Sequence, residues 1–94
     1  MDSREAFIEK LNAAHSFPTR YTFKLIGANR ERFSEDALEV LAEELPSADP
    51  EVSSRMSSGG NHVSVTVVAT VADADTVARV YERFHGLEGL AMLL

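Results

Sequence analysis

The sequence predicts an α+β fold in which helices cover one face of a four-stranded antiparallel sheet. Residues 20–27 and 62–71 alternate apolar and polar side chains, as half-buried strands do. Residues 30–45 and 74–85 instead repeat apolar side chains at the spacing of a helix with one buried face. A glycine-rich turn at residues 58–61 joins two of the strands and indicates a hairpin.

The chain opens with a predicted amphipathic helix at residues 2–14. Asp2 and Glu5 resemble a capping box, in which carboxylates accept hydrogen bonds from free backbone amides. Pro18 disfavours helical geometry at the residue before it, so the helix should stop near His15. The face expected to meet the core consists of Phe7, Leu11 and Ala14.

The first strand, at residues 20–27, should direct Tyr21, Phe23 and Leu25 to one face of the sheet. Its other face carries Thr22, Lys24 and Ile26. Asn29 is a candidate N-cap for the helix at about 30–45, which Pro46 closes. The apolar stripe of that helix is Phe33, Ala37, Val40, Leu41 and Leu45.

The second half of the chain contains a hairpin, a helix and a last strand. Residues 52–58 form a weak, serine-rich strand that suits the edge of a sheet, and Ser58-Gly59-Gly60-Asn61 predicts a tight primed turn. Asp73 should cap the third helix, and Gly86 should provide its left-handed C-cap. The stripe of this helix is Ala74, Val77, Val80, Tyr81 and Phe84, and the final strand is Leu90, Met92 and Leu94.

After the first helix, the order of elements is βαββαβ, the ferredoxin-like or split-βαβ plan. Right-handed crossovers then place both later helices on one face of the sheet, with the strands at 20–27 and 62–71 in the centre. At 94 residues the chain is expected to form a single domain, residues 1–94, with residues 1–15 as a helical extension.

Three segments together resemble the YbeD-like family of small bacterial proteins. They are FPTRYTFKLIG at residues 17–27, SSGGNHVSVTVVAT at 57–70 and VARVYERFHGLEGLAMLL at 77–94. The resemblance covers nearly all of the chain after residue 15. It implies a ferredoxin-like fold close to small regulatory domains, such as those that bind amino acids on metabolic enzymes, and implies no enzyme activity. It also implies a basic residue before the Gly-Asn turn, where this chain has Gly59.

Composition excludes several classes of function. The chain has no cysteine, which removes disulfides and thiolate metal sites. Its formal net charge is -6 and its Lys and Arg residues are not clustered, so binding to a nucleic-acid backbone is not expected. No apolar run is long enough to span a membrane, and the N-terminus lacks a signal-peptide pattern. We therefore expect a cytoplasmic protein.

The sequence shows no set of residues typical of catalysis, and we expect neither a catalytic site nor a cofactor. No serine lies in a GxSxG elbow, and no phosphate-binding glycine loop is present. His15, His62 and His85 are too far apart in sequence to indicate a metal site. Glu35, Glu39 and Glu43 lie on one helix face, which is either simply solvated or an electrostatic patch for a basic partner.

Two regions are left as candidate sites. The sheet face without helices should carry Thr22, Lys24, Ile26, Ser64, Thr66 and Val68. Because an antiparallel sheet can leave one face open, this surface predicts an adaptor or regulatory domain that binds a protein partner. We expect the chain to be a monomer or a weak homodimer formed through the same face. Alternatively, Gly27, Ala28 and Asn29 precede a helix N-terminus, where free amides favour an anion such as the carboxylate of a small metabolite.

Overall fold

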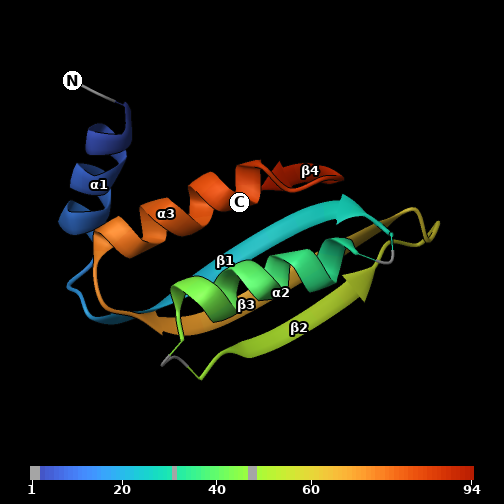
Figure 1. The fold of residues 1–94 in the computed structure, drawn as a ribbon, viewed down its shortest axis with the longest axis horizontal. Coiled ribbons are helices and arrows are strands. Elements are labelled where there is room, and N and C mark those ends of the chain that lie inside the picture. Colours follow the sequence, from blue (N-terminus) through green and yellow to red (C-terminus); the bar gives the residue numbers. More distant parts are fainter. Residues whose placement is uncertain (1–2, 31, 47–48) are drawn as a thin grey trace.

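The computed structural model describes residues 3–30, 32–46 and 49–94, and these form an α+β sandwich (Figure 1). The sheet has the strand order β2-β3-β1-β4, and neighbouring strands are antiparallel. The predicted ferredoxin-like arrangement is confirmed, with β1 and β3 in the centre. The elements are α1 (Ser3–Ala14), β1 (Thr19–Ala28), α2 (Phe33–Glu44), β2 (Glu51–Met56), β3 (His62–Val71), α3 (Ala74–His85) and β4 (Leu90–Leu93).

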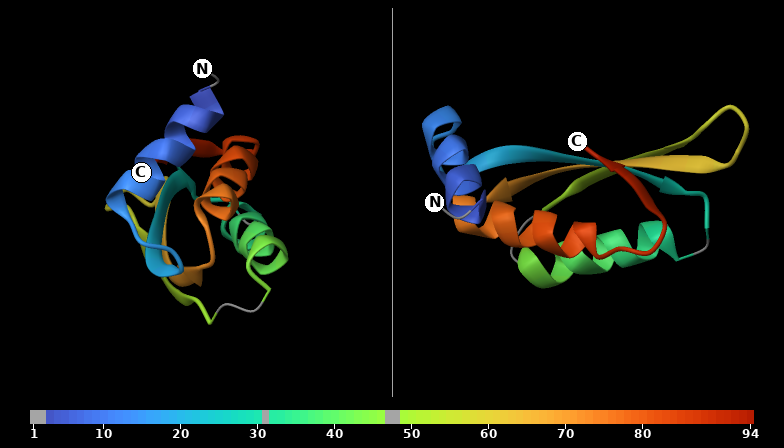
Figure 2. Two further views of the ribbon diagram at one scale, coloured as in Figure 1. Left: turned by 90° about the vertical axis from the view of Figure 1, so that its left-hand side faces the viewer. Right: turned by 90° about the horizontal axis from the view of Figure 1, so that it is seen from above.

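The central pair of strands sets the geometry of the sheet. β1 and β3 are each 10 residues long and pair from Thr19↔Val71 to Ala28↔His62 without a register shift. Alternate side chains of this ladder point to opposite faces. One set is buried under α2 and α3, which lie side by side on one face of the sheet (Figure 2). The buried strand residues are Phe23, Leu25, Val63, Val65, Val67, Ala69 and Val71.

Helices α2 and α3 complete the core from their own apolar stripes. α2 buries Phe33, Ala37, Val40 and Leu41, and α3 buries Val77, Val80 and Phe84 among others. Three large aromatic side chains, Phe23, Phe33 and Phe84, are fully buried.

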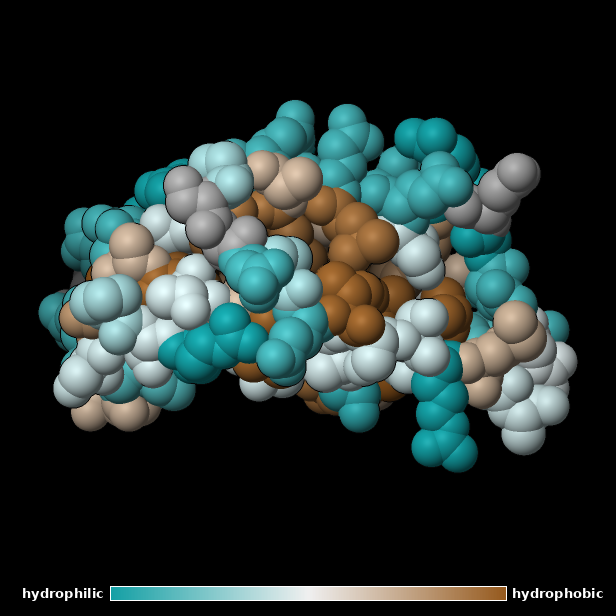
Figure 3. Space-filling view, turned by 90° about the horizontal axis from the view of Figure 1, so that it is seen from below, coloured by the Kyte–Doolittle hydropathy of each residue, from teal (hydrophilic) through white to brown (hydrophobic). Residues whose placement is uncertain are grey.

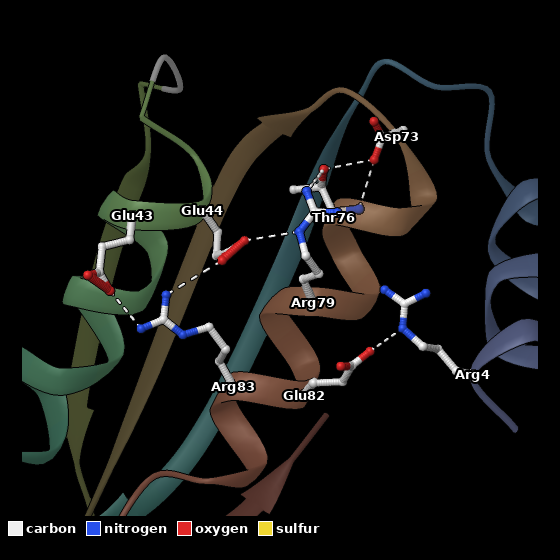
Figure 4. A network of polar contacts seen from close by, with 8 residues as sticks. All are labelled: Arg4, Glu43, Glu44, Asp73, Thr76, Arg79, Glu82 and Arg83. Atoms are coloured by element: carbon white, nitrogen blue, oxygen red, sulfur yellow. Dashed lines mark hydrogen bonds and ion pairs between the residues drawn. The ribbon is translucent and has the colours of Figure 1, made fainter.

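Ion pairs join the surfaces of the two helices (Figure 4). Arg83 of α3 donates to Glu43 at 2.6 Å, and Arg79 donates to Glu44 at 3.1 Å. The hydrogen bond to Glu43 raises the pKa of Arg83 above its usual value. Glu35 pairs with Arg32 at 3.2 Å. Two of the three acidic residues of the predicted helix face, Glu35 and Glu43, therefore already have partners within the chain.

Helix α1 packs against one end of α3. The ring of Phe7 meets that of Tyr81 edge-on, with centroids 5.4 Å apart, and Arg4 pairs with Glu82. Leu11 is buried in the core. The predicted capping box involves Asp2, which lies outside the described residues.

Two predicted helix ends are wrong. α2 begins at Phe33 and not at Arg30, and its N-cap is Arg32, whose side chain makes no cap bond. Asn29 instead fixes the β2–β3 hairpin, because its side-chain amide donates to the Gly60 carbonyl at 2.7 Å. At the end of α3, Gly86 has φ -86°, so it is not the left-handed cap; Gly89, at φ 89°, makes the turn into β4.

The N-cap of α3 is confirmed. Asp73 accepts hydrogen bonds from the backbone amide of Thr76 at 2.8 Å and from its hydroxyl at 2.7 Å (Figure 4). These bonds hold the pKa of the Asp73 carboxyl below its usual range. An ionised carboxylate at the first turn also complements the helix dipole.

The hairpin and the last strand differ from expectation in detail. β2 ends at Met56, and Gly60 is the residue of the hairpin with positive φ, so the connection is longer than a two-residue primed turn. In β4, Leu90 and Leu93 pack against the core whereas Met92 is 51% exposed. A register shift between Ile26 and Gly27 explains this, since the bulge changes which β4 side chains face the helices.

Gly27 is required for packing at the junction of β1 and α2. A Cβ atom at this position would overlap the ring of Phe33. We expect Gly27→Ala to destabilise the fold by roughly 1–3 kcal/mol, the usual cost of overpacking. Urea unfolding followed by circular dichroism measures this change. Gly59→Ala is the matched control, because a Cβ there meets Asn61 only at 3.6 Å, and equal losses in the two variants would contradict the packing role.

Candidate functional site

The six predicted face residues are neighbours in the structure. In the β1–β3 ladder, Thr22 lies opposite Val68, Lys24 opposite Thr66 and Ile26 opposite Ser64. Directly opposed residues of an antiparallel pair point to the same face, and this face is the one that α2 and α3 do not cover (Figure 2). We call it the open face. The predicted placement is confirmed, while the role of these residues in binding stays a prediction.

The outer strands extend the open face on both sides. Ser53 of β2 lies opposite Thr66, and Arg55 opposite Ser64. On the other side Met92 of β4 lies opposite Ile26. These positions were not predicted from the sequence. The hairpin fixes how β2 pairs with β3, so the alternation of side chains along β2 would have placed Ser53 and Arg55 on this face.

The open face differs in charge from the protein as a whole. Three cationic side chains, Arg20, Lys24 and Arg55, come from alternate positions of β1 and β2 that share this face. Within the four described strands, Glu51 is its single acidic residue, and its carboxylate lies 3.6 Å from Arg20. The face therefore carries a local positive excess on a chain of formal net charge -6.

Apolar side chains lie between these cations. Ile26 and Val68 are half-buried in the sheet surface, and Met92 is largely exposed at the β4 side. Next to Ile26, a shallow hollow of about 380 Å³ opens at the hairpin end, and it is lined in part by Arg55, His62 and Ser64. This mixture of cations, hydroxyls and aliphatic groups suits contact with an acidic, partly apolar surface.

The predicted anion site at Gly27–Asn29 is not a loop, because Gly27 and Ala28 are the last two residues of β1, and its backbone has little free hydrogen-bonding capacity. The amide of Ala28 donates to the Gly89 carbonyl, and the amide of Asn29 donates to the Asn61 carbonyl, both at 2.9 Å. Gly27 is buried against the ring of Phe33. The predicted anion site depends on unpaired amides at this point, whereas these amides tie β4 and the hairpin to β1. Ligand binding here stays a prediction that the hydrogen bonds do not favour.

The three histidines have separate surroundings. His15 lies against the rings of Phe17 and Tyr21, His62 lies at the hairpin end of the open face, and His85 lies at the end of α3. In the part of the chain that the structure describes, no group of three or more His, Cys, Asp or Glu residues could hold a metal ion. The described helices include none with the length and hydropathy needed to cross a bilayer.

A second hollow, of about 560 Å³, lies between α1, α3 and β4 and was not foreseen from the sequence. Phe7, Tyr81 and Leu93 contribute to its wall. Burial, reinforced by a hydrogen bond with Tyr21, raises the pKa of Tyr81 far above its usual value. Its hydroxyl donates to the Leu94 carbonyl at 3.1 Å. The Tyr81 hydroxyl therefore links α3 to the end of the chain by a hydrogen bond.

Comparison with known proteins agrees with this description. Residues 12–94 match the family model described as "Protein of unknown function (DUF493)". The chain belongs to this family. UPF0250 proteins of Yersinia pestis (strain Pestoides F) and of Yersinia pseudotuberculosis serotype I are each 33% identical over 86 residues, covering 90% of this chain and 97% of theirs. The resemblance to the YbeD-like proteins is thus confirmed.

A solved structure of low sequence identity has the same fold. The solution structure of protein HP0495 from H. pylori superimposes with a TM-score of 0.70 at 14% identity, covering 85% of each chain. The DUF493 match begins at residue 12, near the end of α1, and includes all four strands with α2 and α3. The open face accordingly lies within the family region, and most of α1 lies before it.

The backbone hydrogen bonds of Ala28 and Asn29 allow a direct test of the predicted anion site. We expect a panel of amino acids and small carboxylates at millimolar concentration to leave the melting temperature unchanged, because the amides they need are already bonded. A thermal-shift assay measures this. A ligand present at 100 times its dissociation constant would stabilise the protein by about 2.7 kcal/mol. A shift that Asn29→Ala abolishes would restore the metabolite-sensing interpretation.

Proposed function

We propose that this DUF493 protein is a cytoplasmic, non-catalytic adaptor or regulatory domain that binds an acidic partner protein through its open face. The observation that carries the proposal is the segregation of charge. Arg20, Lys24 and Arg55 share a surface with one acid, on a chain that is acidic as a whole. A surface that opposes the sign of the rest of the molecule selects both a partner and the orientation in which it docks.

The cations and the apolar groups would have different roles in this binding. Exposed ion pairs contribute only about 0–1 kcal/mol each, so Lys24 and Arg55 would mainly steer the encounter and exclude basic surfaces. Affinity would come from covering Ile26, Val68 and Met92, which offer aliphatic area between the charges. The partner surface should accordingly combine carboxylates with aliphatic side chains.

The structure supports this role in preference to self-association through the same face. Two open faces packed against each other would bring the cations of both copies together. Burying Lys24 without a carboxylate partner is costly, and Arg55 would add like charge. An acidic partner removes this penalty, whereas a second open face does not.

Affinity capture from the native cell tests the proposal. We expect tagged wild-type protein to retain a partner that Lys24→Glu and Arg55→Glu lose, with capture reduced at least ~10-fold, equivalent to about 1.4 kcal/mol. Lys10→Glu is the matched control, because it makes the same charge change on the exposed surface of α1. Circular dichroism verifies that each variant is folded. Equal capture by wild type and both open-face variants would contradict the proposal.

A further inference from the structure

The two edges of the sheet are protected to very different degrees. β4 is 4 residues long and its pairing contains a register shift, two features that discourage further strands from adding. β2 has 6 residues, all exposed, and pairs with β3 without a shift. Its outer side has neither a proline within the strand nor a covering element among the described residues (Figure 1). Such an edge is a template for another strand.

The backbone groups that face outward from β2 can be identified. The Ser57 amide donates to the His62 carbonyl at 2.9 Å, which makes this opposed pair a hydrogen-bonded one. Because hydrogen-bonded and non-bonded pairs alternate along an antiparallel ladder, Ser53 and Arg55 also bond toward β3. The amides and carbonyls of Val52, Ser54 and Met56 therefore point to the free edge.

Two of the three residues whose backbone groups point to the free edge, Val52 and Met56, have apolar side chains that the helices cover only in part. Val52 is 46% exposed and Met56 58% exposed, although they lie on the helix-covered face opposite Val67 and Val63. An apolar hollow of about 270 Å³ is lined by α2 residues, among them Leu38, and by Pro50, which directly precedes β2. Leu38 is itself 37% exposed. Figure 3 views the molecule from the β2 side and shows hydrophobic surface between α2 and β2, bordered by hydrophilic groups.

We propose that β2 pairs with β2 of a second copy of this chain, antiparallel about a twofold axis through Ser54. Val52 then lies opposite Met56 of the second copy, and the symmetry repeats that apolar contact. All three outward-facing residues of β2 take part in hydrogen-bonded pairs. On the open face, Glu51 of one copy lies diagonally across from Arg55 of the other. Side chains of this length and opposite charge can interact at a diagonal position.

The sequence of β2 favours an axis through Ser54 over an axis through the adjacent residue, Ser53. Centring the axis on Ser53 would place Met56 opposite Pro50, which has no amide to donate, and Val52 opposite Ser54. That arrangement loses both the apolar pair and part of the hydrogen bonding. The Ser54 register retains both. The resulting sheet of two copies leaves both open faces uncovered, so the inference is independent of the proposed function.

Disulfide trapping tests the register directly, because the chain has no native cysteine. Across the twofold axis, the Cα atoms of the two Ser54 residues would be ~5.5 Å apart, as in any hydrogen-bonded pair. That distance lies within the range that a disulfide bridges. We expect Ser54→Cys to form a covalent dimer under mild oxidation. Ser53→Cys should do so at least ~10-fold more slowly, because the two Ser53 residues do not lie directly opposite each other in this register. Equal rates for the two variants would overturn the proposed register.

Sedimentation at about 0.1 mM, where mass action favours association, tests the dimer without a cross-link. We expect wild type to sediment as a dimer and Ser54→Pro as a monomer, since the lost amide points outward and bonds nothing in β3. Val68→Asp, on the open face, should remain dimeric. Circular dichroism confirms that the variants are folded, and Val52→Lys gives a second disruption that leaves the backbone intact. A monomeric wild type, or dimers in both Ser54→Pro and Val52→Lys, would overturn the proposal.

Discussion

The structure depends on the uninterrupted pairing of β1 with β3. This ladder spans 10 residues on each strand, from Thr19 opposite Val71 to Ala28 opposite His62. One set of alternating side chains buries Phe23, Leu25 and their valine partners beneath the helices, and the other set forms the centre of the open face. A slip of one residue would exchange the two sets, placing Lys24 in the core and Phe23 in solvent. The same pairing therefore specifies both the core and the candidate site.

The remaining elements are attached to this pair by specific contacts. At one end, Gly27 admits the ring of Phe33, and the amides of Ala28 and Asn29 hold β4 and the hairpin. α3 is fixed by its Asp73 cap and connected to α2 through Arg79 and Arg83. The end of β1, together with Asn29, is therefore a structural junction. Its glycine and asparagine, which suggest an anion site in the sequence, are accounted for by packing and by hydrogen bonds within the chain.

The sequence predicts the central strands well because their signal is local. Alternation along residues 62–71 and 20–27 reports burial on one face, and the same alternation places all six open-face residues correctly. The cap at Asp73 is also local, since it depends on a bond to Thr76 three residues away. These features require no knowledge of distant segments.

The features that the sequence did not reveal are made by segments far apart in the chain. Asn29 looks like a helix cap until the hairpin 31 residues later supplies a carbonyl for its side chain. The orientation of Met92 depends on a bulge opposite Ile26 and Gly27. The acidic residues of α2 appear unpaired in sequence, yet Arg83 of α3 neutralises Glu43 in space. The addition of Arg55 to the open face likewise follows from the β2–β3 register.

Native-state hydrogen exchange measured by NMR tests most directly whether the β1–β3 pair organises the fold. The amides of Phe23, Leu25, Val65 and Val67 should exchange most slowly, with an opening free energy equal to that of global unfolding. Amides of α1 and β4 should exchange through smaller, local openings. If the central amides instead exchanged faster than those of α2 and α3, the helices would not depend on the sheet. That result would contradict the organising role of the β1–β3 pair.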